Sequence, residues 1–558
     1  WWDDLWLNES FADLLGYLAV DGTEQDLGIP EGETLLRHSS RKEWGYDEDS
    51  FETTHPVIAE AEDTNAAMSN FDGITYSKGG ASLWQLIYYI GYNNFVKGVQ
   101  KYFAENKWGN RTRDDFMRYL SESSGIDLSK WQAEWLKTRG ANKVKVIWTK
   151  SGGRSVVKVV QGRDPFDKKL RTHRMKVGVF KYDSKGHLKL ASVVPVTYSG
   201  EKTDITELLS EFPTEPDLVI PNYGDYDYVE VKLSKKSLRT VERDLQQVED
   251  PQARLIIWSS LFRSIRDAEV AALDVCQIAI KHLGAEKNIS VLSSALSTAI
   301  GYLSYISPSQ TKESTRKQFE ALAVSQFQLV SQMPNSDKKK QLQLTWLEWA
   351  IGLSRSNSNL RSLKSYLASG SARGYELDQS LRWEIIKTLN RYNDPDGIRL
   401  LNLEKQRDGS YTGQKGAIVA DVVRPDEQNK RLWWDRITKG KARGDQDELT
   451  LNLRLAAMGG FFLSEQESQT AFAQPFYFDQ FEEISEAEDP YFMRYFSSSF
   501  VPSVDLSGAI QAIEVLLRND DLTTPVRKNL IKTKTRFERR QRGLEQSAKV
   551  CAKSLKRK

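Results

Sequence analysis

The sequence predicts a multidomain, mainly α-helical protein that contains one small β-sandwich. Three observations support this fold class. The chain has 558 residues, more than one hydrophobic core usually organises. Apolar residues recur at helical spacing up to about residue 140 and again after residue 234, whereas the stretch between them has the two-residue period of strands. We therefore expect three domains, at residues 1–140, 141–233 and 234–558.

The first region is expected to consist of packed helices joined by loops. Two sets of apolar residues have the spacing of a helical face: Phe11, Leu14, Leu15 and Leu18, and then Leu83, Leu86, Ile87 and Ile90.

The second region is expected to form the β-sandwich, because its apolar residues alternate and short β-branched runs follow one another. The predicted strands are the alternating stretch from Lys143 to Trp148 and the runs Val156–Val160, Val177–Tyr182 and Val229–Leu233. Turn residues separate them at Gly152–Gly153, Asp183–Gly186 and Pro221–Gly224.

The third region loses the strand pattern and continues as amphipathic stretches to the end of the chain. Polar breaks divide these stretches at Ser307–Ser309, Ser356–Asn359 and Asn393–Gly397. No fixed-period repeat is visible, so we expect an irregular helical solenoid of the HEAT or armadillo kind.

The charge balance and the cysteine count narrow the class of partner and the compartment. Lys and Arg number 78 against 76 Asp and Glu, so no chain-wide positive field attracts nucleic acid. No apolar run is long enough to cross a bilayer, and no membrane span is expected in this chain. Cys276 and Cys551 fit neither a disulfide framework nor a thiolate zinc site, which favours a reducing compartment, the cytoplasm.

Two short segments contain candidate catalytic residues. Glu9, in Leu5-Trp6-Leu7-Asn8-Glu9-Ser10-Phe11, is expected in the first turn of a helix that Asn8 can cap. The helix dipole alone explains an acidic residue there, and a metal ligand is the alternative. Tyr76 lies between Gly73 and Gly79, before an amphipathic helix. A loop of this kind can present a phenol, although a packed, locally hydrogen-bonded Tyr is the simpler interpretation.

The sequence motifs around both residues resemble those of the zinc aminopeptidases of the aminopeptidase N family, which are gluzincins. Trp1 to Ala12 resembles W-W-x-D-L-W-L-N-E-[GS]-F-A, and Ile74 to Gly80 resembles I-x-Y-x-K-G-A, with Gly80 in place of Ala. The resemblance implies that Glu9 is the third zinc ligand. It also implies that the Tyr76 hydroxyl stabilises the oxyanion formed when activated water attacks a peptide carbonyl. We assign no catalytic role to Lys78, which we expect to be a surface or salt-bridging residue.

Two parts of the family's site are missing from the sequence. In the family, an H-E-x-x-H helix supplies two His ligands and the general base, about eighteen residues before the glutamate ligand. No His-Glu pair occurs in this chain, its five histidines form no i, i+4 pair, and no G-x-M-E-N segment is present. We expect these elements upstream of Trp1 and expect the 558 residues alone to be inactive.

The resemblance extends along most of the chain and implies the roles of the three domains. Residues 1–140 resemble the C-terminal part of a thermolysin-like catalytic domain, which ends near Trp131, Trp135 and Gly140. Residues 234–558 resemble the helical C-terminal domain that covers the active site as a lid. The implied function is a zinc-dependent aminopeptidase that removes N-terminal residues from peptides. The alternatives are a non-catalytic helical scaffold that binds peptides or proteins, and a relative that hydrolyses an epoxide.

Overall fold

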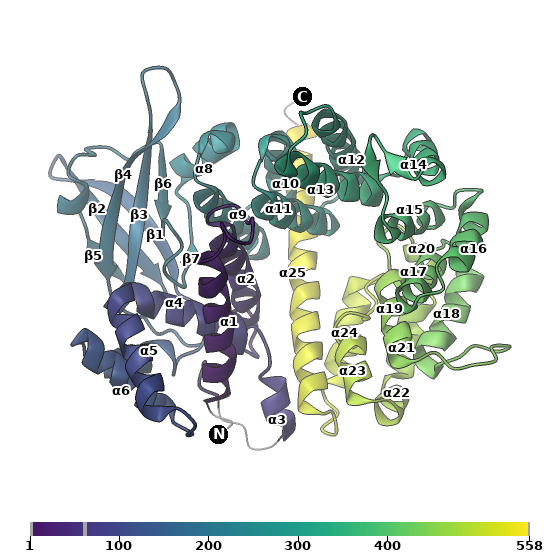
Figure 1. Cartoon of the computed structure of the whole chain (residues 1–558), viewed down its shortest axis with the longest axis horizontal. Coiled ribbons are helices and arrows are strands. Elements are labelled where there is room, and N and C mark those ends of the chain that lie inside the picture. Colours follow the sequence, from purple (N-terminus) through teal and green to yellow (C-terminus); the bar gives the residue numbers. More distant parts are fainter. Residues whose placement is uncertain (1–3, 60–63, 556–558) are drawn as a thin grey trace. The chain divides into compact units, whose positions relative to one another are not determined.

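The computed structural model describes residues 4–59 and 64–555, which are mainly helical and include a small region of β-sheet (Figure 1). Tertiary contacts divide the chain into two units. The first comprises Trp1–Val270 with Ser290–Thr298, and the second comprises Ala271–Ile289 with Ala299–Lys558. The expected domain boundaries near residues 140 and 233 both lie inside the first unit and remain predictions.

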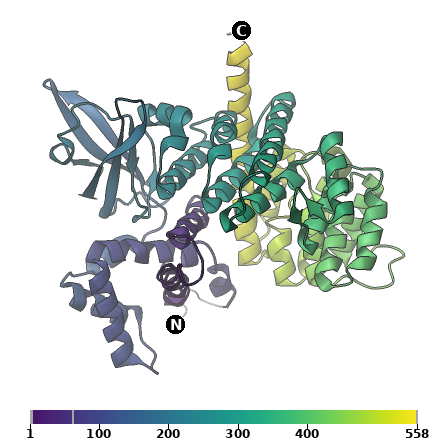
Figure 2. The same ribbon diagram turned by 45° about the horizontal axis from the view of Figure 1, so that its top comes forward.

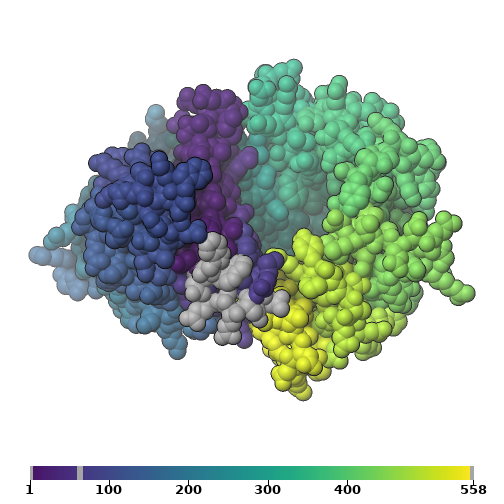
Figure 3. Space-filling model, turned by 60° about the horizontal axis from the view of Figure 1, so that its bottom comes forward, coloured from purple at the N-terminus to yellow at the C-terminus, as the bar shows by residue number. Residues whose placement is uncertain are grey.

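The first unit begins with helices that pack around one apolar core. These are α1 (Leu5–Asp21), α2 (Glu33–Asp49), α3 (Thr64–Ser69), the π-helical turn η2 (Ile74–Lys78), α4 (Gly79–Ile90), α5 (Tyr92–Asn106), α6 (Arg113–Ser124) and α7 (Ser129–Trp135). Both predicted apolar faces point into this core, since Leu14 and all four residues of the α4 set are buried there. Phe11 packs against Phe103 of α5 and Phe116 of α6, with ring centroids 6.2 and 5.5 Å away. Figure 3 shows the surfaces of α1 and of the α5–α6 pair beside each other.

Seven strands follow and form two sheets. The strands are β1 (Lys143–Ser151), β2 (Arg154–Gly162), β3 (His173–Tyr182), β4 (Leu188–Tyr198), β5 (Lys202–Asp204), β6 (Leu218–Pro221) and β7 (Glu230–Val231). One sheet has the order β5-β2-β1-β7 and the other β4-β3-β6. β1 and β2 pair antiparallel from Lys143↔Gly162 to Ser151↔Arg154. Gly152 and Gly153 form their turn with φ of 56° and 80°, the backbone of a two-residue hairpin loop that favours glycine.

The strand prediction is incomplete in this region. β4, β5 and β6 were not predicted, and the run Val229–Leu233 contains only the two-residue β7, which pairs parallel to β1. β4 carries Pro195, which cannot donate a ladder hydrogen bond and therefore weakens a strand pattern. The structure accommodates Pro195 because β4 is an edge strand. A proline in an alternating segment indicates an edge strand here and not a loop.

One short helix, η3 (Glu207–Leu209), lies between β5 and β6. After the sheets the first unit continues with α8 (Lys235–Asp244), η4 (Leu245–Gln247), α9 (Pro251–Arg266) and the larger part of α11 (Ile289–Gly301). The helical pattern begins after Ser234 as predicted, and the Ser234 hydroxyl caps α8 by accepting a hydrogen bond from the Ser237 amide. α9 contacts α2, β6 and β7, so this helix belongs to the first unit.

The second unit is an array of helices with one short hairpin (Figures 1 and 2). Its helices are α10 (Ala272–His282), η5 (Leu283–Ala285), η6 (Tyr302–Tyr305), α12 (Ser309–Ser331), α13 (Asp337–Leu353), α14 (Asn357–Ser369), α15 (Gln379–Arg391), α16 (Gly397–Arg407), α17 (Tyr411–Val422), α18 (Glu427–Lys439), α19 (Leu451–Phe461), α20 (Glu467–Thr470), α21 (Ala473–Asp479), α22 (Phe481–Ala487), α23 (Pro490–Phe496), α24 (Leu506–Leu516) and α25 (Thr524–Leu555). The hairpin pairs β8 (Ser371–Ala372) with β9 (Tyr375–Glu376). The three predicted polar breaks all fall between helices.

Neighbouring helices in this unit pack in a regular order. α12 contacts α13, and α13, α15, α17 and α19 each contact the next member of that series. Cys276 and Cys551 are both free thiols. None of the helices within residues 4–59 and 64–555 combines the length and the apolar composition that a membrane crossing requires.

Lys430 is a charged residue placed in the interior of the second unit. It lies on α18, its side chain is fully buried, and its Nζ donates to the Phe461 carbonyl at 2.8 Å and the Gly460 carbonyl at 3.4 Å. These are C-terminal carbonyls of α19, which a cation or an N–H donor satisfies. Burial lowers the pKa of Lys430 to about 7.

We predict that Lys430 makes the stability of the second unit depend on pH. Because its pKa falls from an ordinary value of about 10.4 to about 7 on folding, the unfolded chain binds more protons between these pH values. The free energy of unfolding therefore rises with pH in that window, by roughly 1 kcal/mol per pH unit. Thermal unfolding of the wild type and of Lys430→Met at pH 7 and pH 9 should show this rise in the wild type alone. Lys439→Met, on the exposed face of α18, is the matched control and should retain the rise; equal profiles for the wild type and Lys430→Met would contradict the prediction.

Candidate active site

Glu9 lies in the second turn of α1, which begins one turn earlier than predicted. The helix starts at Leu5, and Asp4, not Asn8, occupies the capping position. The prediction that Asn8 caps this helix is therefore wrong, because the apolar side chains of Leu5 and Trp6 extend the helix and Trp6 is buried in the core. The helix dipole acts mainly within the first turn, so it does not account for Glu9. Trp1–Asp3 of the predicted motif lie outside the described residues.

Tyr76 is carried by a π-helical turn and not by the predicted loop. The Asp72 carboxylate accepts hydrogen bonds from the amides of Ile74 at 2.9 Å and Thr75 at 3.3 Å, which fixes the start of η2. His55 in turn contacts Asp72, with Nε2 3.0 Å from Oδ2. Single-turn π-helical segments are rare and are frequent at functional sites.

The glycines on either side of Tyr76 allow η2 to approach two helices closely. A Cβ added at Gly73 would lie 2.6 Å from the Trp44 carbonyl oxygen of α2, and one at Gly79 would lie 2.0 Å from the Ser10 hydroxyl of α1. The Ser10 hydroxyl also donates to the Thr75 carbonyl at 2.5 Å. The glycine bracket therefore sets the distance between the tyrosine turn and the helix that carries Glu9.

The structure brings Glu9 and Tyr76 together. The two side chains are close enough for the Glu9 carboxylate to act on the Tyr76 phenol, and both residues are partly exposed. Burial, followed by the interaction with the negatively charged Glu9, raises the pKa of Tyr76 to about 12. The phenol therefore keeps its proton through the neutral range and remains a hydrogen-bond donor. Two residues predicted from separate motifs thus form one polar site.

Three further residues that the sequence did not suggest surround this pair. Asp13 follows Glu9 by one helical turn, and Arg41 of α2 binds it with Nε 3.1 Å from Oδ2. The Arg41 guanidinium lies 5.4 Å above the Trp44 ring, whose plane is 16° from that of Tyr76 with centroids 5.9 Å apart. Burial raises the pKa of Asp13 in spite of Arg41. The i, i+4 spacing from Glu9 could have indicated Asp13, whereas no local pattern marks Arg41 or Trp44.

Glu9 is the only metal-ligand candidate that this site provides among the described residues. No group of three or more His, Cys, Asp and Glu side chains suited to a metal ion occurs within residues 4–59 and 64–555. His55 is engaged by Asp72, and His173 is buried with its ring nitrogens near Asp227 and Asn142. A catalytic zinc site normally has three protein ligands, so these residues alone do not fit one.

Lys78, at the end of η2, has a structural role. It is buried, not on the surface, and its Nζ lies 3.0 Å from Asp49 Oδ1 in the salt bridge that was the other expectation. Asp49 also accepts hydrogen bonds from the Gly140 amide at 3.0 Å, the Thr54 hydroxyl at 2.7 Å and the Tyr228 hydroxyl at 3.0 Å. Burial lowers the pKa of Lys78 and Asp49 opposes this shift. The pair joins α2, η2 and the segments before β1 and β7.

The comparisons with known proteins agree with this site. A model described as the peptidase family M1 domain matches residues 1–135. A model described as the ERAP1-like C-terminal domain matches residues 218–535, more than half of the chain. With its similarity to aminopeptidase N, the chain belongs to the aminopeptidase N-like family of M1 peptidases.

Named relatives match different lengths of the chain. Aminopeptidase N of Streptomyces lividans is 27% identical over 517 residues, which cover 91% of this chain and 58% of the relative. Leucyl aminopeptidase of Saccharolobus solfataricus is 35% identical over 146 residues, covering 26% of this chain and 18% of the relative. Tricorn protease-interacting factor F2 of Thermoplasma acidophilum is 33% identical over 156 residues, covering 28% and 19%. The chain spans less than two thirds of the length of these relatives.

We predict that breaking the Asp49–Lys78 pair destabilises the first unit strongly. Lys78→Met leaves a buried carboxylate without its cation, which typically costs about 3–5 kcal/mol. Lys101→Met is the matched control, because Lys101 and Glu122 form an exposed pair and such pairs contribute little to stability. Urea unfolding followed by tryptophan fluorescence measures both changes. A loss for Lys78→Met no larger than that of the control would show that the pair does not hold the unit together.

Proposed function

We propose that this chain forms part of a zinc-dependent aminopeptidase that removes N-terminal residues from peptides. The observation that carries the proposal is the proximity of the Glu9 carboxylate and the Tyr76 phenol, which two separate segments bring together. Family membership supports the reaction class, and relatives that match this chain are named aminopeptidases. The substrates are peptides with a free N-terminus.

In this proposal Glu9 is one carboxylate ligand of the zinc ion. The remaining ligands and the general base do not come from the described residues, whose own contribution is to fix the geometry around Glu9 and Tyr76. Asp13, Arg41 and Trp44 fix the position of the helices around this pair. Arg41 links α1 to α2 through Asp13, and it stacks on the Trp44 ring, which faces Tyr76. They are positioning residues.

Tyr76 acts as a neutral hydrogen-bond donor. When water attacks a peptide carbonyl, negative charge develops on the carbonyl oxygen, and a phenol fixed beside it stabilises that charge without giving up its proton. The raised pKa of about 12 keeps the donor proton in place. The ring of Trp44 and the packing of η2 against α1 and α2 limit the movement of the phenol before the reaction.

The rest of the chain has supporting roles in the proposal. The two sheets form a β-sandwich, and the helical array of the second unit is a solenoid of the HEAT kind. The series of contacts from α13 through α15 and α17 to α19 supports the solenoid, since alternate helices of such arrays form one layer. This helical part acts as a lid that admits short peptides.

We predict that Tyr76→Phe lowers kcat of the complete gene product by about 100- to 1,000-fold, because one oxyanion donor is lost. KM for an aminoacyl p-nitroanilide should change little, since the phenol acts mainly in the transition state. Tyr92→Phe is the matched control, because Tyr92 is exposed, and it should retain full activity.

The same preparations distinguish the enzyme from a non-catalytic scaffold. Glu9→Gln should reduce the bound zinc measured by elemental analysis, since it removes one ligand. A wild-type gene product that binds peptides but neither retains zinc nor cleaves anilides would establish the scaffold in place of the enzyme. Normal kcat in Tyr76→Phe would remove the role of Tyr76 alone.

A further inference from the structure

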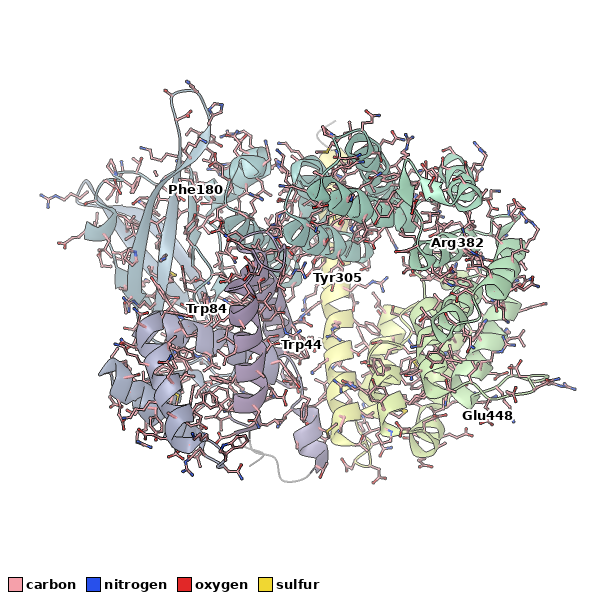
Figure 4. All side chains as sticks on the ribbon, viewed as in Figure 1. Trp44, Trp84, Phe180, Tyr305, Arg382 and Glu448 are labelled. Atoms are coloured by element: carbon pink, nitrogen blue, oxygen red, sulfur yellow. The ribbon has the colours of Figure 1, made fainter. Side chains whose placement is uncertain are left out.

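The first unit contains a cavity that does not include the Glu9–Tyr76 pair. Its volume is about 460 Å³, within the range of small-molecule sites. Its walls come from the N-terminal half of α2, from Trp84 of α4, from the turn before β7 and from the start of α9. Figure 4 labels Trp84, which lines this cavity, and Trp44, which stacks on Tyr76 and does not line it.

His38 is an unpaired polar group in the wall of this cavity. Its side chain is 4% exposed, and neither ring nitrogen has a hydrogen-bond partner within the part of the chain that the structure describes. Its ring contacts are edge-on, to Tyr17 at 5.3 Å and Trp84 at 6.2 Å between centroids. The ring nitrogens of His38 are not among the fully buried side-chain atoms that lack a partner, so they can be reached from the cavity, and a ligand there can hydrogen-bond to them.

The ionisation of His38 suits it to accept a hydrogen bond from a ligand. Burial, with the nearby charges of Lys42 and Arg41, lowers its pKa to about 3, so the ring is neutral at physiological pH. Neutral imidazole has one nitrogen that accepts a hydrogen bond. Lys42 and Arg41 are engaged elsewhere, by Asp225 at 3.0 Å and by Asp13 at 3.1 Å.

The other lining groups define the chemistry of the ligand. The charged residues in the wall are Glu31 and Asp250, neither of which has an ion-pair partner among the described residues, and no Lys or Arg lines the cavity. Trp84 and Tyr226 present aromatic rings, and Leu35 and Pro251 add apolar surface. Lys176 Nζ already lies 4.4 Å from the centroid of the Tyr226 ring, which leaves Trp84 as the aromatic wall for a ligand. Two carboxylates without an ion-pair partner, beside this ring and the apolar wall, favour a cation with an apolar body and repel an anion.

Most of the remaining polar groups in the wall already have partners. The Gln252 side-chain amide donates to the Ser39 hydroxyl at 2.8 Å, and the Gln252 main-chain amide donates to Asp250 at 2.9 Å. The Tyr226 hydroxyl accepts from Lys176 at 3.3 Å. This leaves His38 as the buried acceptor and Glu31 as the exposed carboxylate for a ligand.

We propose that this cavity is a binding site for a small organic amine, whose ammonium group binds near Glu31 and His38 while its apolar body lies against Trp84. The site is separate from the proposed peptidase site. Arg41 and Trp44 share helix α2 with His38, but none of Glu9, Asp13, Arg41, Trp44 and Tyr76 lines the cavity.

The test uses 2-phenylethylamine as the probe and isothermal titration calorimetry of the 558-residue chain. Binding is expected with a dissociation constant in the millimolar range or below, as the size of the probe allows. The matched probes are 3-phenylpropionate, which carries the opposite charge, and neutral 2-phenylethanol. Both should bind at least about tenfold more weakly, because they lack the cation.

Two variants locate the binding. Glu31 is exposed, so Glu31→Lys should leave the fold intact and weaken amine binding by about tenfold or more, since it replaces an attractive charge with a repulsive one. Glu52→Lys makes the same charge change at an exposed residue outside the cavity and should leave binding unchanged. Glu9→Gln, which removes the carboxylate charge of the peptidase site, should also leave amine binding unchanged, which excludes binding at that site.

Three results would overturn the proposal: no heat of binding at about 10 mM amine, equal binding of amine and carboxylate, or equal weakening by Glu31→Lys and Glu52→Lys. A loss of amine binding in Glu9→Gln would place the amine at the peptidase site and would also overturn it. As a second readout, the Trp fluorescence change on amine binding should be lost in Trp84→Leu and retained in Trp108→Leu, since Trp108 is fully exposed.

Discussion

The buried ion pair of Asp49 and Lys78 is the constraint on which the first unit depends. Asp49 accepts four hydrogen bonds that come from η2, from the loop after α2, from the Gly140 amide and from Tyr228. Such a carboxylate is stable inside a protein only when every partner is present. The pair therefore fixes the C-terminal ends of α2 and η2 in the same place, and Tyr76, two residues before Lys78, is positioned as a consequence.

The candidate site was largely predictable from sequence because its residues lie in long, specific sequence motifs. Both Glu9 and Tyr76 were named from such motifs, and the structure places their side chains close to each other. The reason for the glycine bracket was not predictable, since it depends on the Trp44 carbonyl of α2 and the Ser10 side chain of α1, which approach η2 only in the folded chain. Arg41 and Trp44 were missed for the same reason: their role arises from contacts between helices and not from spacing along one helix.

The fold was predictable where periodicity is strong and not where strands are short or interrupted. The apolar faces of α1 and α4 and the hairpin at Gly152–Gly153 followed from local pattern. β4 was missed because Pro195 interrupts its pattern, and the start of α1 was misplaced because Asn8 is a good capping residue at a position where the helix has already begun. In each case the burial of apolar side chains contributes more free energy than the local conformational preference of the residue, and burial therefore decides the structure.

The π-helical form of η2 has a consequence for how this segment tolerates changes in length. A π turn contains one residue more than an α turn over the same rise, so the segment from Ile74 to Lys78 stores an extra residue next to the start of α4. Removing one residue there lets the backbone relax into an ordinary α-helix without shortening α4. The side chain of Tyr76 then rotates around the helix axis relative to α1, while Lys78 still reaches the interior only if α4 turns with it. A single-codon deletion in this turn therefore separates the phenol from Glu9, in a way that no substitution of either residue reproduces.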